Sequence, residues 1–222
     1  MQETGIKNPS IKLAELGISP SKVNWNLSVE ELSNQTVALG QGTITDTGAL
    51  AVNTGKFTGR SPKDKLTVKD SITENSVDWS DINIAISPEH FDKIYTDITA
   101  YLNNKEIWAR DAYACADPKH RLNILVINEA PWANLFCNDL FLRPTTDEIQ
   151  TQIPEWTIIQ APGFEATPSI HGTRQGNFTV VNFTKKMILI GGSAYTGEMK
   201  KGIFGVLNYV LPHQKGVLSM HC

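Results

Sequence analysis

The amino-acid sequence predicts an α/β fold, as a single domain with a large mixed β-sheet flanked by helices. Short apolar runs rich in β-branched residues, such as residues 122–128 and 187–190, have the length of buried strands. Segments with apolar residues at helical spacing lie between such runs, and capping signals mark where the helices begin. Because strands and helices are interspersed and nothing marks a domain boundary, we expect one domain over residues 1–222.

The individual elements follow from local signals along the chain. Ser28 and Glu31 form a capping box that begins a helix, and a strand pair surrounds a turn at residues 46–48. The polar loop 53–64 leads into a strand at 66–68. The other expected elements are a short helix at 11–16, a helix from Ser87 with an apolar stripe packed in the core, strands at 106–115 and 122–128, a helix at 131–141 with Leu135, Phe136 and Leu140 inward, a short helix from Thr145, a strand at 156–161, and a hairpin-like pair at 178–183 and 187–190.

Composition excludes several classes of protein. The chain has 222 residues, of which 41% are hydrophobic and 19% charged, as in a soluble globular protein. Its net charge of −3 argues against a general nucleic-acid binder. The three cysteines have no paired spacing, and no segment is apolar enough for a signal peptide or a membrane span. We therefore expect a cytoplasmic protein without nucleic-acid or membrane partners.

The rest of the chain is organised around residues 187–211, where a strand, a glycine-rich turn and a helix follow one another. Gly191 and Gly192 end the strand and allow a turn where a Cβ would clash. A helical pattern begins after Gly197, and Pro212 closes it. Its apolar positions are Ile203, Phe204, Leu207, Val210 and Leu211.

Two lysines occupy the first turn of this helix, where the helix dipole is already positive. Lys200 and Lys201, with backbone N–H groups beside them, predict a corner that attracts anions, and only Glu198 offsets their charge. Because each charge disfavours the other, we expect a lowered lysine pKa and an amine able to act as a base or metal ligand. The alternative is a solvated lysine pair on an ordinary helix.

Neither glycine-rich segment is a nucleotide phosphate loop. Residues 192–197 have the glycine spacing, but Glu198 and Met199 follow in place of lysine and a hydroxyl residue. Residues 55–61 are one residue too short and carry Arg60 in place of the lysine. We find no third candidate in the 222 residues.

The loop 53–64 is the second candidate site, because basic residues cluster in it. Arg60 lies between Gly59, which lets the backbone approach a ligand, and Ser61-Pro62, which stiffens the loop. An arginine held in this way suits two-point recognition of a carboxylate or phosphate. A merely solvated surface loop is the alternative. The basic residues of this region are Lys56, Arg60, Lys63 and Lys65.

Of the histidines, only His221 has a context that indicates a ligand. It lies in an apolar segment, 216–222, that is typical of a strand, and a strand–helix–strand return can bring it to the same sheet edge as Lys201. An imidazole beside a neutral amine would make half of a metal site, although a buried structural histidine remains the alternative. For the others, surface or capping roles are expected: His90, His120, His171 and His213.

Several motifs, in order across nearly the whole chain, resemble the ATP-dependent phosphoenolpyruvate carboxykinases. The Gly-Glu-Met-Lys-Lys run at 197–201 resembles the ATP-using branch of that family. The matching segments are TGRSPKDK at 58–65, DAY at 111–113, ADP at 116–118 with Arg121-Leu122, LRP at 142–144, IGGSAYTGEMKK at 190–201, NYVLP at 208–212 and MHC at 220–222.

The resemblance implies a lyase of gluconeogenesis that decarboxylates oxaloacetate and phosphorylates the enolate with ATP, giving phosphoenolpyruvate, CO2 and ADP. It implies that Arg60 binds the substrate carboxylate, that Tyr195 contacts the substrate or CO2, and that Lys200 lies beside the transferred phosphoryl group. It also implies that Lys200 and Lys201 are catalytic, that Lys201 contacts the substrate, and that Lys201 and His221 bind the Mn2+ cofactor as ligands, while Mg2+ accompanies ATP. The fold implied is that of the carboxykinase N-terminal domain.

The chain departs from this family in length. Members are more than twice as long, and after Met-His-Cys they continue into a phosphate loop, a magnesium-binding carboxylate and an adenine pocket. The chain stops at Cys222, inside the strand expected there. We therefore expect an N-terminal, substrate-binding domain that lacks its nucleotide-binding partner domain, binds no cofactor and is inactive alone. A non-enzymatic anion-binding module and a structural domain completed only by its partner domain are the alternatives.

Overall fold

The computed structural model describes residues 1–219. The strands are β1 (Gln2–Gly5), β2 (Lys22–Trp25), β3 (Gly42–Ile44), β4 (Leu50–Val52), β5 (Lys65–Val68), β6 (Ile84–Ile86), β7 (Glu106–Ala114), β8 (Leu122–Asn128), β9 (Trp156–Ala161), β10 (Phe178–Asn182) and β11 (Met187–Gly191). The helices are α1 (Val29–Ala38), α2 (Pro88–Leu102), α3 (Pro131–Leu140), α4 (Thr146–Thr151), α5 (Pro168–His171) and α6 (Gly197–Val210). Short helical turns are η1 (Leu13–Leu16), η2 (Pro62–Asp64) and η3 (Leu211–Lys215).

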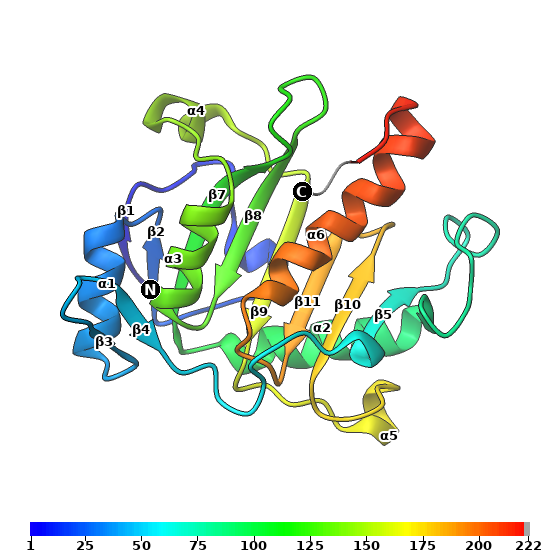
Figure 1. Cartoon of the computed structure of the whole chain (residues 1–222), viewed down its shortest axis with the longest axis horizontal. Helices are drawn as coiled ribbons and strands as arrows, with labels where there is room; N and C mark the ends of the chain where they lie inside the picture. Colours follow the sequence, from blue (N-terminus) through cyan, green and yellow to red (C-terminus); the bar gives the residue numbers. More distant parts are fainter. Residues whose placement is uncertain (220–222) are drawn as a thin grey trace.

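Nine of the strands form one mixed sheet, which confirms the predicted α/β class. Their order is β1-β2-β7-β8-β9-β11-β10-β5-β6, and β3 pairs with β4 in a separate hairpin (Figure 1). The pairs β7–β8 and β10–β11 are antiparallel, as expected for strands joined by short turns, and the other neighbours in the sheet are parallel. The sheet therefore brings β5 beside β10, although more than a hundred residues separate them in the chain.

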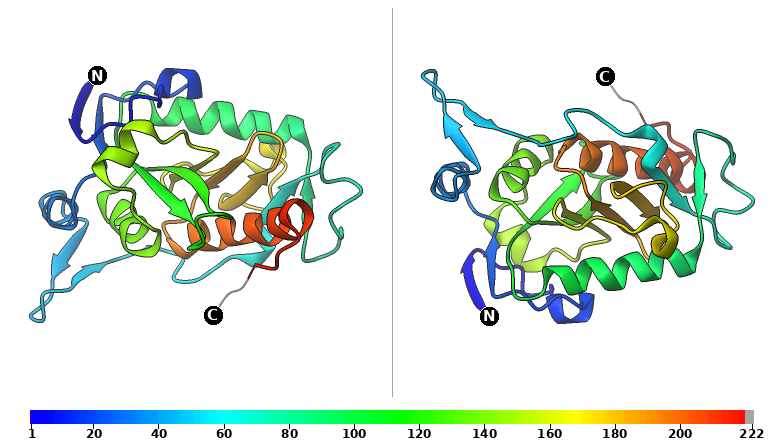
Figure 2. Two further views of the ribbon diagram at one scale, coloured as in Figure 1. Left: turned by 90° about the horizontal axis from the view of Figure 1, so that it is seen from above. Right: turned by 90° about the horizontal axis from the view of Figure 1, so that it is seen from below.

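Helices cover both faces of this sheet, as Figure 2 shows from above and below. On one face the stripe of α2 that was expected in the core is buried, through Phe91, Ile94, Ile98 and Leu102. On the other face α3 and α6 pack side by side, through Trp132 and Cys137 of α3 and Met199, Ile203, Val206 and Val210 of α6. Because both faces are covered, the central strands are buried almost throughout, in keeping with their continuous apolar runs.

Local capping signals set where the helices begin. The hydroxyl of Ser28 accepts from the backbone N–H of Glu31 at 3.2 Å, and the Glu31 carboxylate accepts from the Ser28 backbone N–H at 2.8 Å. The same reciprocal pair forms between Thr145 and Glu148 at α4. Both capping boxes are confirmed, since they depend only on residues three apart.

Replacing Ser28 with alanine is expected to lower the free energy of unfolding by about 1 kcal/mol, because the amide of Glu31 loses its acceptor. Urea unfolding followed by circular dichroism measures this. Ser33→Ala is the matched control, because Ser33 lies on the same helix and its hydroxyl only returns to the carbonyl of Val29. Equal losses in the two variants would contradict a specific capping role.

Three expectations differ from the structure. Leu140 is 37% exposed, because α3 instead turns Ala133 and Cys137 toward the sheet. The strand expected at 216–222 does not form over residues 217–219, and residues 220–222 lie outside the described part. Helix α6 ends at Val210, and one π-helical turn containing Pro212 follows it.

No helix within residues 1–219 combines the length and apolar character needed to cross a membrane. Two cysteines in this range carry free thiols, the half-buried Cys115 and the buried Cys137. Burial raises the pKa of the Cys137 thiol to about 12, so this side chain stays protonated and unreactive at neutral pH.

Candidate functional site

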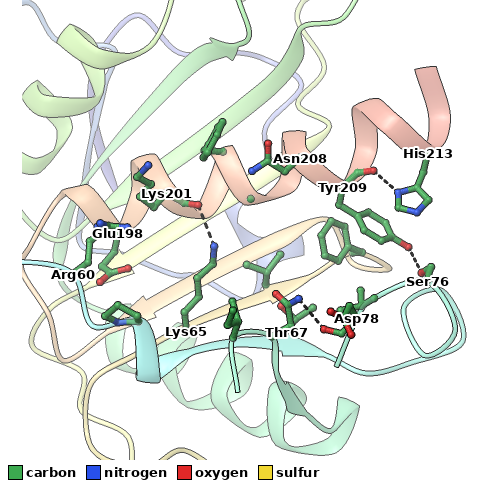
Figure 3. Close-up of a pocket in the computed structure, with 18 residues that line it drawn as sticks. Arg60, Lys65, Thr67, Ser76, Asp78, Glu198, Lys201, Asn208, Tyr209 and His213 are labelled. Carbon is green, nitrogen blue, oxygen red and sulfur yellow. Dashed lines mark hydrogen bonds between the residues drawn. The ribbon is translucent and has the colours of Figure 1, made fainter. Parts of the chain in front are cut away.

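A pocket of about 480 Å³ lies between strand β5 and helix α6. Arg60, Lys65 and Lys201 line one end of it, where Figure 3 shows them near Glu198. The opposite end is lined by the aromatic ring of Tyr209 together with His213 and other residues. The two basic segments singled out in the sequence therefore contribute to a single cavity, although they lie about 140 residues apart.

The glycine-rich turn before α6 lets the helix start close to the sheet. A Cβ at Gly191 would lie 2.6 Å from ring carbons of Phe178, and one at Gly192 would lie 2.7 Å from the Gly176 carbonyl oxygen. Gly192 also has φ +64°, in the left-handed region that favours glycine. Farther along α6, a Cβ at Gly202 would approach Ile188 to 3.2 Å, so the helix packs tightly on β11.

The loop that carries Arg60 is anchored at two points. The backbone N–H of Ser61 donates to Glu198 at 2.8 Å, which ties the loop to the first turn of α6. The buried carboxylate of Asp64 accepts two hydrogen bonds from the Arg174 guanidinium, at 2.9 and 2.8 Å. Arg60 itself is exposed at the mouth of the pocket. The loop is therefore held by its backbone and by Asp64, while the guanidinium of Arg60 reaches solvent.

Lys65 lies deeper in the pocket and is half-buried. It begins β5, where alternation puts Lys65 and Thr67 on the face toward α6 and Leu66 and Val68 on the face toward α2. Its Nζ donates to the carbonyl oxygen of Lys201 at 3.2 Å. Desolvation lowers the pKa of Lys65; the charge of Glu198 opposes this shift, and those of Lys201 and Arg60 add to it. Lys65 is thus a third cation of the site.

Replacing Lys65 with methionine is expected to stabilise the chain at neutral pH. The pKa of Lys65 is 10.5 in the unfolded chain and lower in the folded chain, so the unfolded chain binds this proton more tightly. The free energy of unfolding should therefore rise as the pH rises through the folded-state pKa toward 10.5. The gain in Lys65→Met should therefore shrink as the pH rises toward that value. Urea unfolding between pH 7 and 10.5 measures the effect, with the exposed Lys63→Met as control. A gain that did not change with pH would argue against charge burial as its cause.

The two lysines at the start of α6 have different positions. Lys201 lines the pocket, and its Nζ lies 4.9 Å from the ring centroid of Phe204. Lys200 precedes Lys201 and therefore points about 100° away from it around the helix axis. It is half-buried and is not among the described residues that line this pocket. Two amides of the first turn are also paired, from Glu198 to the Tyr195 carbonyl at 3.2 Å and from Met199 to the Thr196 carbonyl at 3.1 Å. The helix start therefore offers an anion fewer backbone donors than expected.

Tyr195 lies on the turn before α6 and is half-buried. Its ring packs over Gly197, where a Cβ would come within 2.4 Å of a ring carbon. Like Lys200, it is not part of the described lining of the Arg60 pocket. His221, the other residue expected at the site, lies outside the described residues.

The far end of the pocket is closed by a contact between α6 and the loop after β5. The Tyr209 hydroxyl lies 2.6 Å from the Ser76 hydroxyl and donates to the Ile72 carbonyl at 3.2 Å. The ring of His213 lies tilted against that of Tyr209, with centroids 4.6 Å apart. Helix α6 thus contacts both loops that flank β5, the Arg60 loop near its start and this loop near its end.

One histidine for which a surface or capping role was expected is buried. His171 is buried, and its Nε2 lies 2.9 Å from a carboxylate oxygen of Asp97. Its Nδ1 accepts from the backbone N–H of Thr167 at 2.7 Å. These bonds join α5 to α2, away from the pocket, so His171 is structural.

The described residues do not by themselves fit a divalent metal ion. No cluster of three or more histidine, cysteine, aspartate or glutamate side chains suited to a metal occurs within residues 1–219. Arg60 and Lys201 both act by charge on Lys65, and such a group of cations disfavours another positive ion beside it. The assignment of Lys201 and His221 as Mn2+ ligands stays a prediction.

Two residues of the site carry little sequence signal of a function. Lys65 stands out in the sequence only as part of a basic loop, yet its alternation with Leu66 and Val68 places it on the face opposite the apolar residues. Glu198 stands out only as an acid in the first turn of a helix, yet it is 4% exposed. No local pattern indicates that burial, since charged residues at helix starts are usually solvated.

The comparisons with known proteins match proteins of one name. The family model described as phosphoenolpyruvate carboxykinase matches residues 21–222. The phosphoenolpyruvate carboxykinase (ATP) of Flavobacterium johnsoniae is 54% identical over 213 residues, which are 96% of this chain and 40% of that protein. The enzyme of the same name from Geobacillus kaustophilus is 47% identical over 98% of this chain and 41% of that protein. The chain thus spans about 40% of the length of these relatives.

Proposed function

Because this chain belongs to the ATP-dependent phosphoenolpyruvate carboxykinase family, we propose that it forms the substrate-binding part of such an enzyme. Its relatives carry the name phosphoenolpyruvate carboxykinase (ATP), and the chain spans about 40% of their length. The proposed ligands are oxaloacetate and phosphoenolpyruvate, bound in the pocket between β5 and α6, and the proposed location is the cytoplasm.

The observation that carries this proposal is the convergence of Arg60, Lys65 and Lys201 on one pocket. A guanidinium presents two parallel N–H donors that match a carboxylate, so Arg60 is the proposed partner of the substrate carboxylate. Loss of CO2 from oxaloacetate leaves an enolate, and preorganised cations stabilise its negative charge as it develops. Lys201 is proposed to lie beside that oxygen.

The remaining roles rest on the family alone. Tyr195 is proposed to contact substrate or CO2, and Lys200 to lie beside the transferred phosphoryl group. Lys201 and His221 are proposed as ligands of Mn2+, an ion that would stabilise negative charge on the reacting oxygen atoms. Partners proposed for the complete protein are ATP with Mg2+, CO2 and a C-terminal nucleotide-binding domain.

Titration calorimetry of the chain with phosphoenolpyruvate tests the binding role. The expected result is saturable binding that is tighter than the binding of sulfate at the same ionic strength. Because both are small anions, sulfate controls for attraction to positive charge alone. Equal affinity for sulfate, phosphoenolpyruvate and oxaloacetate would favour the alternative of a general anion-binding module.

A turnover assay with oxaloacetate, ATP and Mn2+ tests the proposal that this chain is inactive alone. Phosphoryl transfer needs a site that holds the nucleotide phosphates, and the 222 residues contain no phosphate-loop motif. No phosphoenolpyruvate is therefore expected to form. ATP-dependent turnover by the purified chain would contradict this part of the proposal.

A further inference from the structure

Glu198 is a buried carboxylate in a pocket whose ligand is proposed to be an anion. It is 4% exposed and lies in the first turn of α6. One of its carboxylate oxygens accepts from the backbone N–H of Ser61 at 2.8 Å, and the other lies 3.4 Å from the Thr179 hydroxyl. A negative charge at this place would repel an anionic ligand unless a nearby cation offset it.

Lys65 provides that cation. In the sheet, Lys65 on β5 is paired with Thr179 on β10, and the hydroxyl of Thr179 also contacts Glu198. The Lys65 ammonium donates to the Lys201 carbonyl, and a Cβ at Gly205 would lie only 2.8 Å from Nζ. The absence of a side chain at Gly205 therefore leaves the room that the ammonium occupies. Among the charged groups that act on Lys65, Glu198 is the attractive one, and Arg60 and Lys201 are repulsive.

Lys65 and Glu198 carry opposite charges, and Lys65 also lies among the positive charges of Arg60 and Lys201. If Lys65 and Glu198 offset one another, the buried carboxylate no longer repels an anion bound by Arg60 and Lys201, the two side chains assigned to the ligand.

We propose that Lys65 and Glu198 are positioning residues of this site, which cancel each other's charge and hold Arg60 and Lys201 against a small anionic ligand. Glu198 acts through the Ser61 amide on the Arg60 loop, and Lys65 acts on α6 through the carbonyl of Lys201. The ligand in this inference is that of the proposed function, on which the inference rests.

Phosphoenolpyruvate titrations of four forms of the chain test the charge balance. Lys65→Met leaves Glu198 unbalanced and should weaken binding about tenfold, because the repulsion between the Glu198 carboxylate and the anionic ligand is then no longer offset. Glu198→Gln keeps an acceptor for Ser61 and should bind no more weakly than the original chain. The double variant should return to within about threefold of it.

A purely structural role for the pair gives a different pattern. Each single substitution would then weaken binding, and the double variant would be the weakest. That pattern would overturn the inference, and so would a Lys65→Met variant that binds normally. Thermal unfolding confirms that each variant is folded, and Lys65→Gln, which also removes the positive charge, repeats the test made with Lys65→Met.

Hydrogen exchange at Ser61 tests the anchoring without any ligand. Glu198→Ala should speed exchange of the Ser61 amide at least tenfold, whereas Glu198→Gln should not, because only the alanine variant removes the acceptor. Unchanged exchange in Glu198→Ala would overturn the positioning role of Glu198. If the original chain fails to bind phosphoenolpyruvate, the proposed function is wrong. Hydrogen exchange then still shows whether Glu198 anchors the Arg60 loop through the Ser61 amide.

Discussion

Replacing Arg60 with alanine is expected to weaken phosphoenolpyruvate binding about 100-fold. A charged, two-point hydrogen-bonded contact contributes about 3 kcal/mol, and every 1.4 kcal/mol, roughly, changes the dissociation constant tenfold. Titration calorimetry at constant ionic strength measures the loss. Arg60→Lys should bind phosphoenolpyruvate about tenfold more weakly than the original chain, and so more tightly than Arg60→Ala. Lysine keeps the positive charge but has no planar pair of donors.

Lys63→Ala is the matched control for Arg60. Lys63 belongs to the same basic loop, is exposed and does not line the described pocket. Its replacement removes one positive charge and should change binding less than threefold. Similar losses for Arg60→Ala and Lys63→Ala would mean that the loop attracts anions only through its overall charge.

Replacing Gly192 with alanine is expected to lower the free energy of unfolding by about 3 kcal/mol. The left-handed conformation at φ +64° costs a residue with a side chain about 1–2 kcal/mol. The added Cβ would also lie 2.7 Å from both the Asn177 Cα and the Gly176 carbonyl oxygen, and such overpacking costs about 1–3 kcal/mol. Because these neighbours are backbone atoms, they cannot move aside by a change of rotamer. Urea unfolding measures the loss.

Gly40→Ala separates the two contributions. Gly40 has φ +67° and no atom within 4 Å of an added Cβ, so only the conformational cost applies. Its expected loss is about 1 kcal/mol. If both variants lost the same stability, the close approach of the 176–177 backbone to Gly192 would have no energetic consequence.

Most elements of the fold could be predicted from local patterns. The capping boxes at Ser28 and Thr145 place two helix starts correctly, because a cap involves side chains and amides only three residues apart. The strands β8, β9 and β11 are apolar runs bounded by turn residues, and their burial on both faces gives that pattern.

The strands at the margins of the sheet could not be predicted in this way. Strand β1 is mostly exposed and reads Gln-Glu-Thr-Gly, with none of the alternation of a half-buried strand. It forms because β2 offers it a parallel partner some twenty residues along the chain. β2 and β6 are likewise short, and the conformation of all three depends on pairing more than on propensity.

Some residues of the candidate site could likewise be predicted from the sequence, whereas its long-range contacts could not. Arg60 and Lys201 were singled out by residue type and by their glycine-containing surroundings, and the family resemblance rested on the same segments. The sequence could not show that Glu198 is buried or that it accepts from Ser61, 137 residues away. Nor could it show that Lys65 reaches the carbonyl of Lys201.

By itself, then, the sequence determined the helix starts, the central strands, the strand–turn–helix around Gly192 and the membership in a family. These depend on interactions between residues a few positions apart, or on motifs that can be compared directly. The tertiary structure alone decided that β5 lies beside β10 and that α6 packs on β10 and β11. Burial and charge balance are sums over neighbours that are distant in the chain, so the pocket and its buried Glu198 exist only once the sheet has brought those neighbours together.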